Sequence, residues 1–200
     1  TEAMNLELAH KLKNAQVERK DWGIRAAIQR AGVDTAHPEL AQAARHFWGK
    51  NFFSNLHLHH DVPIEGAVDF VQTFHAIGAE VIYLTARDIT KMKEGTIASL
   101  RTHEFPLSED AKELVMKPGP NEDELFKEHW FNGLEKHRYQ KIWFFENEPV
   151  NVNLIRKDLP EIEILFFDST HSGREEKPLD MPYLRHFLID SFEIPQKDEE

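Results

Sequence analysis

Polar side chains of the kind that bind phosphate and Mg²⁺ directly follow two apolar runs of this sequence. Thr85 and Arg87 come after the first run, and Glu146 and Asn147 come after the second. A hydroxyl and a guanidinium can hold phosphate oxygens, whereas the acidic group supplies the hard oxygen ligands that Mg²⁺ prefers. These residue types in this order indicate phosphoryl transfer and predict Mg²⁺ as the cofactor.

A phosphoryl-transfer site also needs a cationic side chain, and two lysines compete for that role. Lys117 follows a short apolar run and begins the sequence KPGP, whereas Lys127 lies in the sequence DELFK, inside a segment with helical spacing. A single lysine is more often solvated than catalytic, and a threonine that follows a strand is most often a helix cap. The residue types by themselves leave both lysines as candidates.

The segment from Val62 to Asp88 indicates how such residues would be positioned. Pro63 suits the first turn of a helix, apolar residues then recur at helical spacing, and Gly78 is suited to end the helix. The run at 81–84 is rich in strand formers, which predicts a strand covered on both faces and followed by Thr85. Polar residues that follow such a strand lie where open α/β sheets bind their ligands.

Further short apolar runs at 114–116, 142–145 and 162–167 alternate with helical segments. This alternation predicts an α/β fold in which a mainly parallel, Rossmann-like sheet forms the middle of three layers. Right-handed crossovers bring the carboxyl ends of parallel strands to one edge of the sheet. We therefore expect one cluster that contains Thr85, Lys117 or Lys127, the group Glu146 to Glu148, and Asp168.

The composition narrows the classes of protein to which this chain can belong. It has 200 residues, a formal net charge of -11 and no cysteine. The acidic balance argues against a protein that reads a nucleic-acid backbone, and the lack of cysteine excludes disulfides and thiolate chemistry within this chain. No apolar run has the length of a membrane span, and we expect a cytoplasmic protein without a long nucleic-acid partner.

The pattern of the sequence divides the chain into three regions. Residues 1–60 are expected to form a small helical region and a connector, because no convincing strand pattern occurs there. Residues 61–192 carry the alternating strands and helices of the α/β core. Residues 193–200 read as a polar tail.

Taken in order, YLTARD, the lysine segment and FFENEPVNVN resemble three motifs of the haloacid dehalogenase-like (HAD) phosphatases. The resemblance covers about residues 62–168. It implies that the Thr85 hydroxyl binds the transferring phosphoryl group and that Arg87 contacts phosphate or substrate. It also implies that Lys127 or Lys117 neutralises the phosphoryl charge, with Lys127 slightly favoured.

The same resemblance implies a Mg²⁺ site and a cap. Glu146 and Asn147 match the position of the metal ligands, which are usually two Asp residues in that family, with Glu148 and Asn151 as nearby alternates. Asn in place of Asp removes a negative charge, which weakens the metal motif. The helical region at 1–50 looks like the cap that the family often inserts after its first strand.

One motif of the family is not found where it is expected. An apolar strand ending in DxD supplies the nucleophilic Asp and the general acid and base in HAD phosphatases, and nothing before Val62 matches it. We expect this motif upstream of Thr1. The alternatives are that Asp168, in the sequence FFDST, supplies it through a circular permutation, or that the motif is lost. In the last case the chain would be an inactive binding or scaffold protein.

Overall fold

The computed structural model describes residues 23–30, 38–119 and 123–188, together with His10, Glu18 and Asp21. The elements, in chain order, are α2 (Arg25–Arg30), α3 (Pro38–Phe52), the 3-10 helix η1 (Asn55–His60), α4 (Ala67–Ala76), β1 (Tyr83–Asp88), α5 (Ile89–Thr102), β2 (Leu114–Lys117), α6 (Asp123–Gly133), the 3-10 helix η2 (Lys136–Arg138), β3 (Trp143–Glu146), α7 (Pro149–Asp158), β4 (Glu163–Phe167) and β5 (Tyr183–Leu184).

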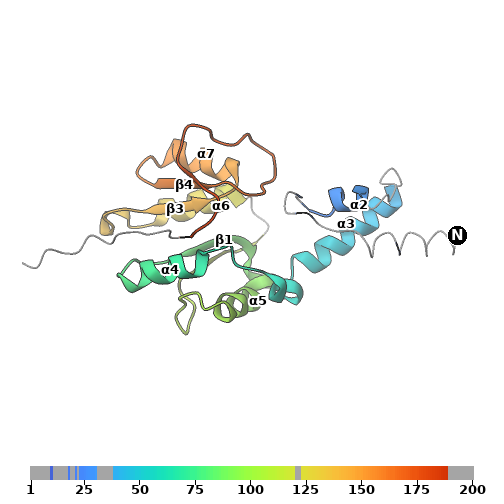
Figure 1. Cartoon of the computed structure of the whole chain (residues 1–200), viewed down its shortest axis with the longest axis horizontal. Helices are drawn as coiled ribbons and strands as arrows, with labels where there is room; N and C mark the ends of the chain where they lie inside the picture. Colours follow the sequence, from blue (N-terminus) through green and yellow to red (C-terminus); the bar gives the residue numbers. More distant parts are fainter. Residues whose placement is uncertain are drawn as a thin grey trace, which may run out of the picture.

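The predicted α/β class is confirmed in a coarse form, as a mixed fold with parallel strands. Figure 1 shows β3, β4 and α7 in the upper part of the view, β1, α4 and α5 below them, and α2 and α3 to the right. The predicted tail at 193–200 lies outside the described residues, as do most of residues 1–22 and all of residues 31–37 within the predicted helical region at 1–60. None of the helices in the described ranges is both long and apolar enough to cross a membrane.

Helix α4 begins later than the sequence predicts. Pro63 was expected in its first turn, but the helix starts at Ala67, because Gly66 takes a left-handed conformation with φ 76° at the N-cap. Its end agrees with the prediction, since Gly78 has φ 93° and its N–H donates to the carbonyl of His75 at 3.0 Å. Positive φ at both ends explains why glycine occupies these positions.

The first sheet consists of β1 and β2, which pair in parallel. Their register is Tyr83 with Leu114 and Thr85 with Met116, and it then shifts before Asp88. β1 includes Thr85 and the residues that follow it, which the sequence places after the strand. Every residue of β1 is partly exposed, so this strand is not covered on both faces as predicted.

The second sheet has the order β3-β4-β5, again with parallel pairing. Along β3 the side chains alternate, and Phe144 packs on Phe131 of α6 with ring centroids 5.0 Å apart. Phe131 and Phe144 share a buried cluster with Ile155 of α7, which is fully buried. The face of β3 that carries Phe144 therefore packs against α6 and α7.

The opposite face of β3 carries an aromatic cluster. Phe145 contacts Phe70 of α4 at 5.4 Å between centroids, and Phe187 lies 5.1 Å from Phe70 and 5.6 Å from Phe145. The Phe187 ring also stacks on Phe167 of β4, with centroids 5.1 Å apart and an interplanar angle of 6°. These rings attach both α4 and the segment after β5 to the second sheet.

The two sheets are neighbours, but within the described residues no ladder joins them. Leu84 of β1 packs against the buried cluster that contains Phe144 of β3. β1 nevertheless pairs only with β2, and β3 pairs only with β4, among the described strands. The single sheet expected from the sequence is therefore present as two smaller ones.

Tyr83 gives a prediction about stability at high pH. Its hydroxyl donates to the carbonyl of Pro106 at 2.8 Å, and burial, with the charge of Glu113, raises the pKa of Tyr83 from 10.0 to about 12. Because ionisation is easier in the unfolded chain, the stabilisation is complete below pH 10 and is lost as pH rises towards 12. Urea unfolding should show Tyr83→Phe about 1 kcal/mol less stable at pH 8, from the lost hydrogen bond, with this gap closing above pH 10. A gap that stays constant up to pH 11 would contradict the assignment.

Candidate functional site

A buried ion pair lies at the carboxyl end of β3. Glu146 is the last residue of that strand and is 5 % exposed, and Lys127 from the middle of α6 is 8 % exposed. The Lys127 ammonium forms a hydrogen bond and ion pair with Glu146 Oε2. Lys127 Nζ also lies 5.8 Å from the centroid of the Phe144 ring, on the same strand as Glu146. Of the two candidate lysines, Lys127 is therefore the one that contacts Glu146.

Both oxygens of Glu146 accept further hydrogen bonds. Oε1 accepts from the backbone N–H groups of Asn147 at 2.9 Å and Glu148 at 3.0 Å. Oε2 accepts from Nδ2 of Asn151 at 3.0 Å, in addition to the Lys127 ammonium. This set of donors satisfies both carboxylate oxygens and fixes their orientation.

Asn151 contributes an acceptor that is not used within the described residues. It lies in the first turns of α7, is 3 % exposed, and turns its amide nitrogen to Glu146. Its Oδ1 is buried and meets no hydrogen-bond donor in the part of the chain that the structure describes. Because burying an unpaired polar atom costs free energy, this oxygen is suited to a donor or cation that binds from outside.

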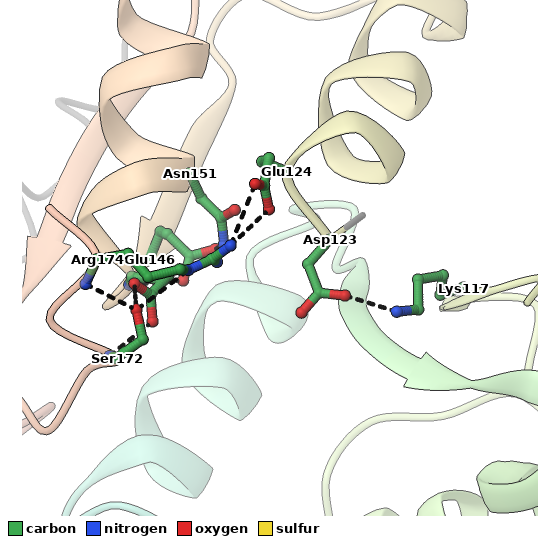
Figure 2. Close-up of polar contacts among 8 residues, drawn as sticks. Lys117, Asp123, Glu124, Glu146, Asn151, Ser172 and Arg174 are labelled. Atoms are coloured by element: carbon green, nitrogen blue, oxygen red, sulfur yellow. Dashed lines mark hydrogen bonds and ion pairs between the residues drawn. The ribbon is translucent and has the colours of Figure 1, made fainter. Parts of the chain in front are cut away.

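A loop after β4 closes over the next carboxylate, Glu148, which is 8 % exposed. The backbone N–H of Ser172 donates to Glu148 Oε2 at 3.0 Å, and the Ser172 hydroxyl contacts Oε1 at 2.5 Å. Arg174 then joins Ser172 to Glu124 of α6, with its Nη1 at 3.2 Å and 3.3 Å from the two Glu124 oxygens. Figure 2 shows Arg174 between Glu124 and Ser172, with Asn151 and Glu146 beside them.

Asn147 also contacts this loop, since its Nδ2 donates to the carbonyl of Thr170 at 2.8 Å. Of the two residues predicted as metal ligands, Glu146 contacts Lys127, and Asn147 donates its backbone N–H to Glu146. Glu148 was expected as an alternate metal ligand, whereas Ser172, Arg174 and Glu124 were not predicted as site residues. The sequence ENE pointed towards Glu148, but Ser172 and Arg174 lie in a turn-rich stretch without any pattern that could have marked them.

Lys117 lies at the end of β2, and its Nζ is 2.6 Å from Asp123 Oδ1 at the start of α6 (Figure 2). The Lys117 side chain is 13 % exposed, and that of Asp123 is 44 % exposed. This contact ties β2 to the helix that carries Lys127. Lys117 is thus linked to α6, and among the described residues the structure shows no contact between it and Glu146.

The side chains of Thr85 and Arg87 contact groups other than the Lys127–Glu146 pair. The Thr85 Oγ1 accepts from the backbone N–H of Arg87 at 3.3 Å, which leaves the hydroxyl hydrogen available to donate. The Arg87 guanidinium lies 2.6 Å from Asp61 and 3.3 Å from the hydroxyl of Thr96 in α5. The structure shows no direct contact from Thr85 or Arg87 to the Lys127–Glu146 pair among the described residues.

Asp168, the alternative nucleophile, follows β4 and lies in its own ion pairs. It contacts the Lys177 ammonium, and its Oδ2 lies 3.1 Å from Nε of Arg185. The hydrogen bond from Lys177, with the charges of Lys177 and Arg185, lowers the pKa of the Asp168 carboxyl below its ordinary value. These ion pairs link Asp168 to the chain between β4 and β5 and to Arg185 after β5. They give Asp168 a structural role that does not require catalysis.

The oxygen atoms around Glu146 are of the kind that bind Mg²⁺. Among the described residues, too few of them belong to carboxylates to complete a site. Oxygen ligands from Glu146, Asn147 and the unused Oδ1 of Asn151 are of the type that Mg²⁺ prefers. No group of three or more His, Asp or Glu side chains able to hold a metal occurs in the described residues. A complete site would need further carboxylate oxygens from another segment.

Comparisons with known proteins add no relative to this picture. No model of a protein family, no curated protein and no solved structure matches the chain.

Proposed function

We propose that this chain forms part of a Mg²⁺-dependent phosphatase of the HAD type, with a Rossmann-like three-layer core and a small helical cap. The observation that carries the proposal is the buried pair between Lys127 and Glu146. The sequence resemblance assigns these two residues to one phosphoryl site, although nineteen positions separate them. Their meeting at the carboxyl end of a parallel strand is also where α/β folds bind ligands.

The division into two sheets supports the proposal that a further strand completes the core. β1 and β3 belong to two sheets of parallel strands, and Leu84 of β1 packs against the cluster that contains Phe144 of β3. Among the described strands, β1 and β3 each have one unpaired edge. Open strand edges bind an added strand readily. A strand that ends in DxD, placed between β1 and β3, would bring its carboxylates next to Thr85 on one side and Glu146 on the other.

The reaction that this arrangement would perform is hydrolysis of a small phosphomonoester. A carboxylate oxygen of the added strand attacks phosphorus, the bond to the ester oxygen breaks, and the second Asp gives its proton to the leaving alcohol. The Thr85 hydroxyl donates to a phosphoryl oxygen, and the Lys127 ammonium offsets the negative charge. Water then attacks the aspartyl-phosphate and releases inorganic phosphate.

Mg²⁺ would be held by Glu146, Asn147 and the carboxylates of the added strand, and it would neutralise charge on the phosphoryl oxygens. Asn151, whose Nδ2 donates to Glu146, would offer its Oδ1, which is unused among the described residues, as a further oxygen ligand. A small phosphorylated molecule in the cytoplasm is the substrate we propose, since the net charge of -11 disfavours a long nucleic acid.

Turnover by the full natural polypeptide tests the proposal. Hydrolysis of p-nitrophenyl phosphate should depend on Mg²⁺, and Thr85→Val should lower kcat about 10²- to 10³-fold through loss of one hydrogen-bond donor to the transition state. Thr85→Ser keeps the hydroxyl and serves as the matched control, with most of the activity retained. Intact mass and N-terminal sequencing of the same polypeptide should show an additional apolar segment that ends in the sequence DxD. Mg²⁺-independent turnover, or full activity in Thr85→Val, would refute the site.

A second function, as a non-catalytic binding or scaffold protein, is favoured by one observation. Both oxygens of Glu146 are already used by Lys127, Asn151 and two backbone N–H groups. A buried carboxylate whose hydrogen bonds are satisfied in this way can stabilise the fold without binding a metal. This alternative predicts no Mg²⁺-dependent turnover by the full natural polypeptide.

A further inference from the structure

A cavity of about 320 Å³ lies between α5, β1 and the segment that joins η1 to α4. Its volume is within the range of pockets that bind small molecules. Its lining combines an arginine, a histidine and two hydroxyls with apolar side chains. Concave sites with apolar walls and a few polar groups that point inwards are typical of ligand-binding sites.

The polar groups of this cavity are centred on Arg87. Its Nη2 lies 2.6 Å from Oδ2 of Asp61, and its Nη1 donates to the hydroxyl of Thr96 at 3.3 Å. His103 Nε2 lies 2.9 Å from the backbone carbonyl of Asp61. In the cavity, the guanidinium of Arg87 is therefore paired with the carboxylate of Asp61.

That partner is not buried with Arg87. The side chains of Arg87 and Asp61 are 33 % and 37 % exposed, so water reaches the pair. Ion pairs of this kind contribute little free energy, and a competing carboxylate can replace one partner. Asp61 lies between η1 and α4 and caps η1 through its backbone N–H, which donates to the carbonyl of Leu58. A turn of its partly exposed side chain towards solvent therefore does not remove that bond.

The remaining wall of the cavity is apolar. Leu100 of α5, Phe105 and Pro63 line it, together with Val62, which is 84 % exposed. An exposed valine beside such a cavity gains free energy when a ligand with apolar atoms covers it. The wall thus favours an organic anion over a bare inorganic one.

We propose that this cavity binds a small organic monocarboxylate, which takes the place of the Asp61 side chain on Arg87. The fork of the guanidinium matches the two oxygens of a carboxylate, and the apolar wall accepts a short hydrocarbon body. Once Asp61 has turned away, Arg87 provides a single positive charge. A monoanion is therefore matched, whereas a phosphate dianion would retain an uncompensated charge.

The proposal does not depend on phosphatase activity. No lining residue of the cavity contacts Lys127 or Glu146 among the described residues. Binding is measured without turnover, so the two proposals can fail separately. Loss of Mg²⁺-dependent hydrolysis would leave carboxylate binding unaffected, and the reverse also holds.

Sodium butyrate and inorganic phosphate are the probes for a titration followed by ¹H–¹⁵N NMR. Butyrate should saturate the wild-type chain with a Kd on the order of 1 mM and shift the signals of Arg87 and His103. Asp61→Asn should bind butyrate roughly tenfold more tightly, because it removes the competing charge and keeps the size of the side chain. Asp69→Asn, which removes an exposed charge on α4, is the matched control and should bind as the wild type does.

Arg87→Gln should weaken butyrate binding at least about tenfold, since it removes the charged partner. Ser99→Trp gives a test that leaves Arg87 and Asp61 in place, because the indole would fill part of the cavity and should abolish binding. Binding that is equally tight in Asp61→Asn, Ser99→Trp and wild type would overturn the site. Phosphate binding that is tighter than butyrate binding would overturn the assignment to a monocarboxylate.

Discussion

Replacing Lys127 with Met is expected to lower the free energy of unfolding by about 3–5 kcal/mol, because it leaves the carboxylate of Glu146 buried without its cation. Glu146 is 5 % exposed, so water cannot take over the role of Lys127 without a change in structure. Urea unfolding at neutral pH, with the slope of the transition compared between variants, measures this change.

A double-mutant cycle separates the pair from the general effect of losing a lysine. Combining Lys127→Met with Glu146→Gln removes both charges. The amide oxygen of the introduced glutamine can still accept from the backbone N–H groups of Asn147 and Glu148, which now donate to the carboxylate. The double variant should therefore regain about 1–3 kcal/mol relative to the sum of the single variants. Additive losses would show that the pair is not coupled.

Lys141→Met is the matched control for this experiment. Lys141 Nζ lies 2.8 Å from Glu163 Oε1, with side chains 60 % and 52 % exposed. An exposed pair of that kind contributes about 0–1 kcal/mol, so this variant should unfold close to wild type. If Lys127→Met and Lys141→Met lowered the free energy of unfolding equally, burial of the Lys127–Glu146 pair would not be the cause of the expected loss.

The stability effect also changes how an activity loss at Lys127 should be interpreted. A variant that lacks this ammonium loses both a charge at the proposed phosphoryl site and a partner of a buried carboxylate. For that reason Thr85 is the better position for a catalytic test: it is partly exposed, and its hydroxyl accepts only a backbone N–H at 3.3 Å among the described contacts.

The sequence predicted the elements of the α/β part well, because their signals are local. Alternation of apolar runs and helical spacing located β2, β3 and β4 to within about a residue or two, and Pro149 marked the first turn of α7. The pattern predicted that Lys117 or Lys127 would meet the acidic group at Glu146, and the structure shows this contact for Lys127. Lys127 lies in a segment with helical spacing, and Glu146 directly follows an apolar run, so the sequence indicates the type of element that carries each of them.

Long-range pairing was harder to predict, because strand spacing does not say which edges meet. Four apolar runs suggest one sheet, yet β1 pairs only with β2 among the described strands, and its residues are all partly exposed. Arg87 illustrates the consequence. Its place in the sequence groups it with Thr85 and the phosphoryl site, whereas its guanidinium lies against Asp61, 26 residues earlier in the chain.

The contact between Gly66 and the segment after β5 is another feature that no local pattern encodes. Gly66 has φ 76°, and a Cβ at this position would lie 2.5 Å from the backbone N of Leu188 and 2.5 Å from the carbonyl carbon of Phe187. The Phe187 N–H also donates to the carbonyl of Glu65 at 2.9 Å. The backbone at 187–188 therefore packs directly on the turn before α4, at a distance that only glycine permits.

Gly66→Ala is accordingly expected to destabilise the protein by roughly 3 kcal/mol or more, with strain from the left-handed conformation adding to the displacement of Phe187. Moving that segment separates the Phe187 ring from Phe70, Phe145 and Phe167. Thermal and urea unfolding measure the loss, and near-ultraviolet circular dichroism should report the change in aromatic packing.

Gly78→Ala is the control that isolates the steric part of this effect. Gly78 also has a positive φ of 93°, but a Cβ there would meet nothing within 4 Å. It should therefore cost only the conformational strain, about 1–2 kcal/mol. In a Phe187→Ala background the cost of Gly66→Ala should fall towards that of Gly78→Ala, because the displaced segment no longer carries a ring that the cluster needs. If the two glycine variants were equally stable, the segment after β5 would contribute nothing to holding α4 on the second sheet.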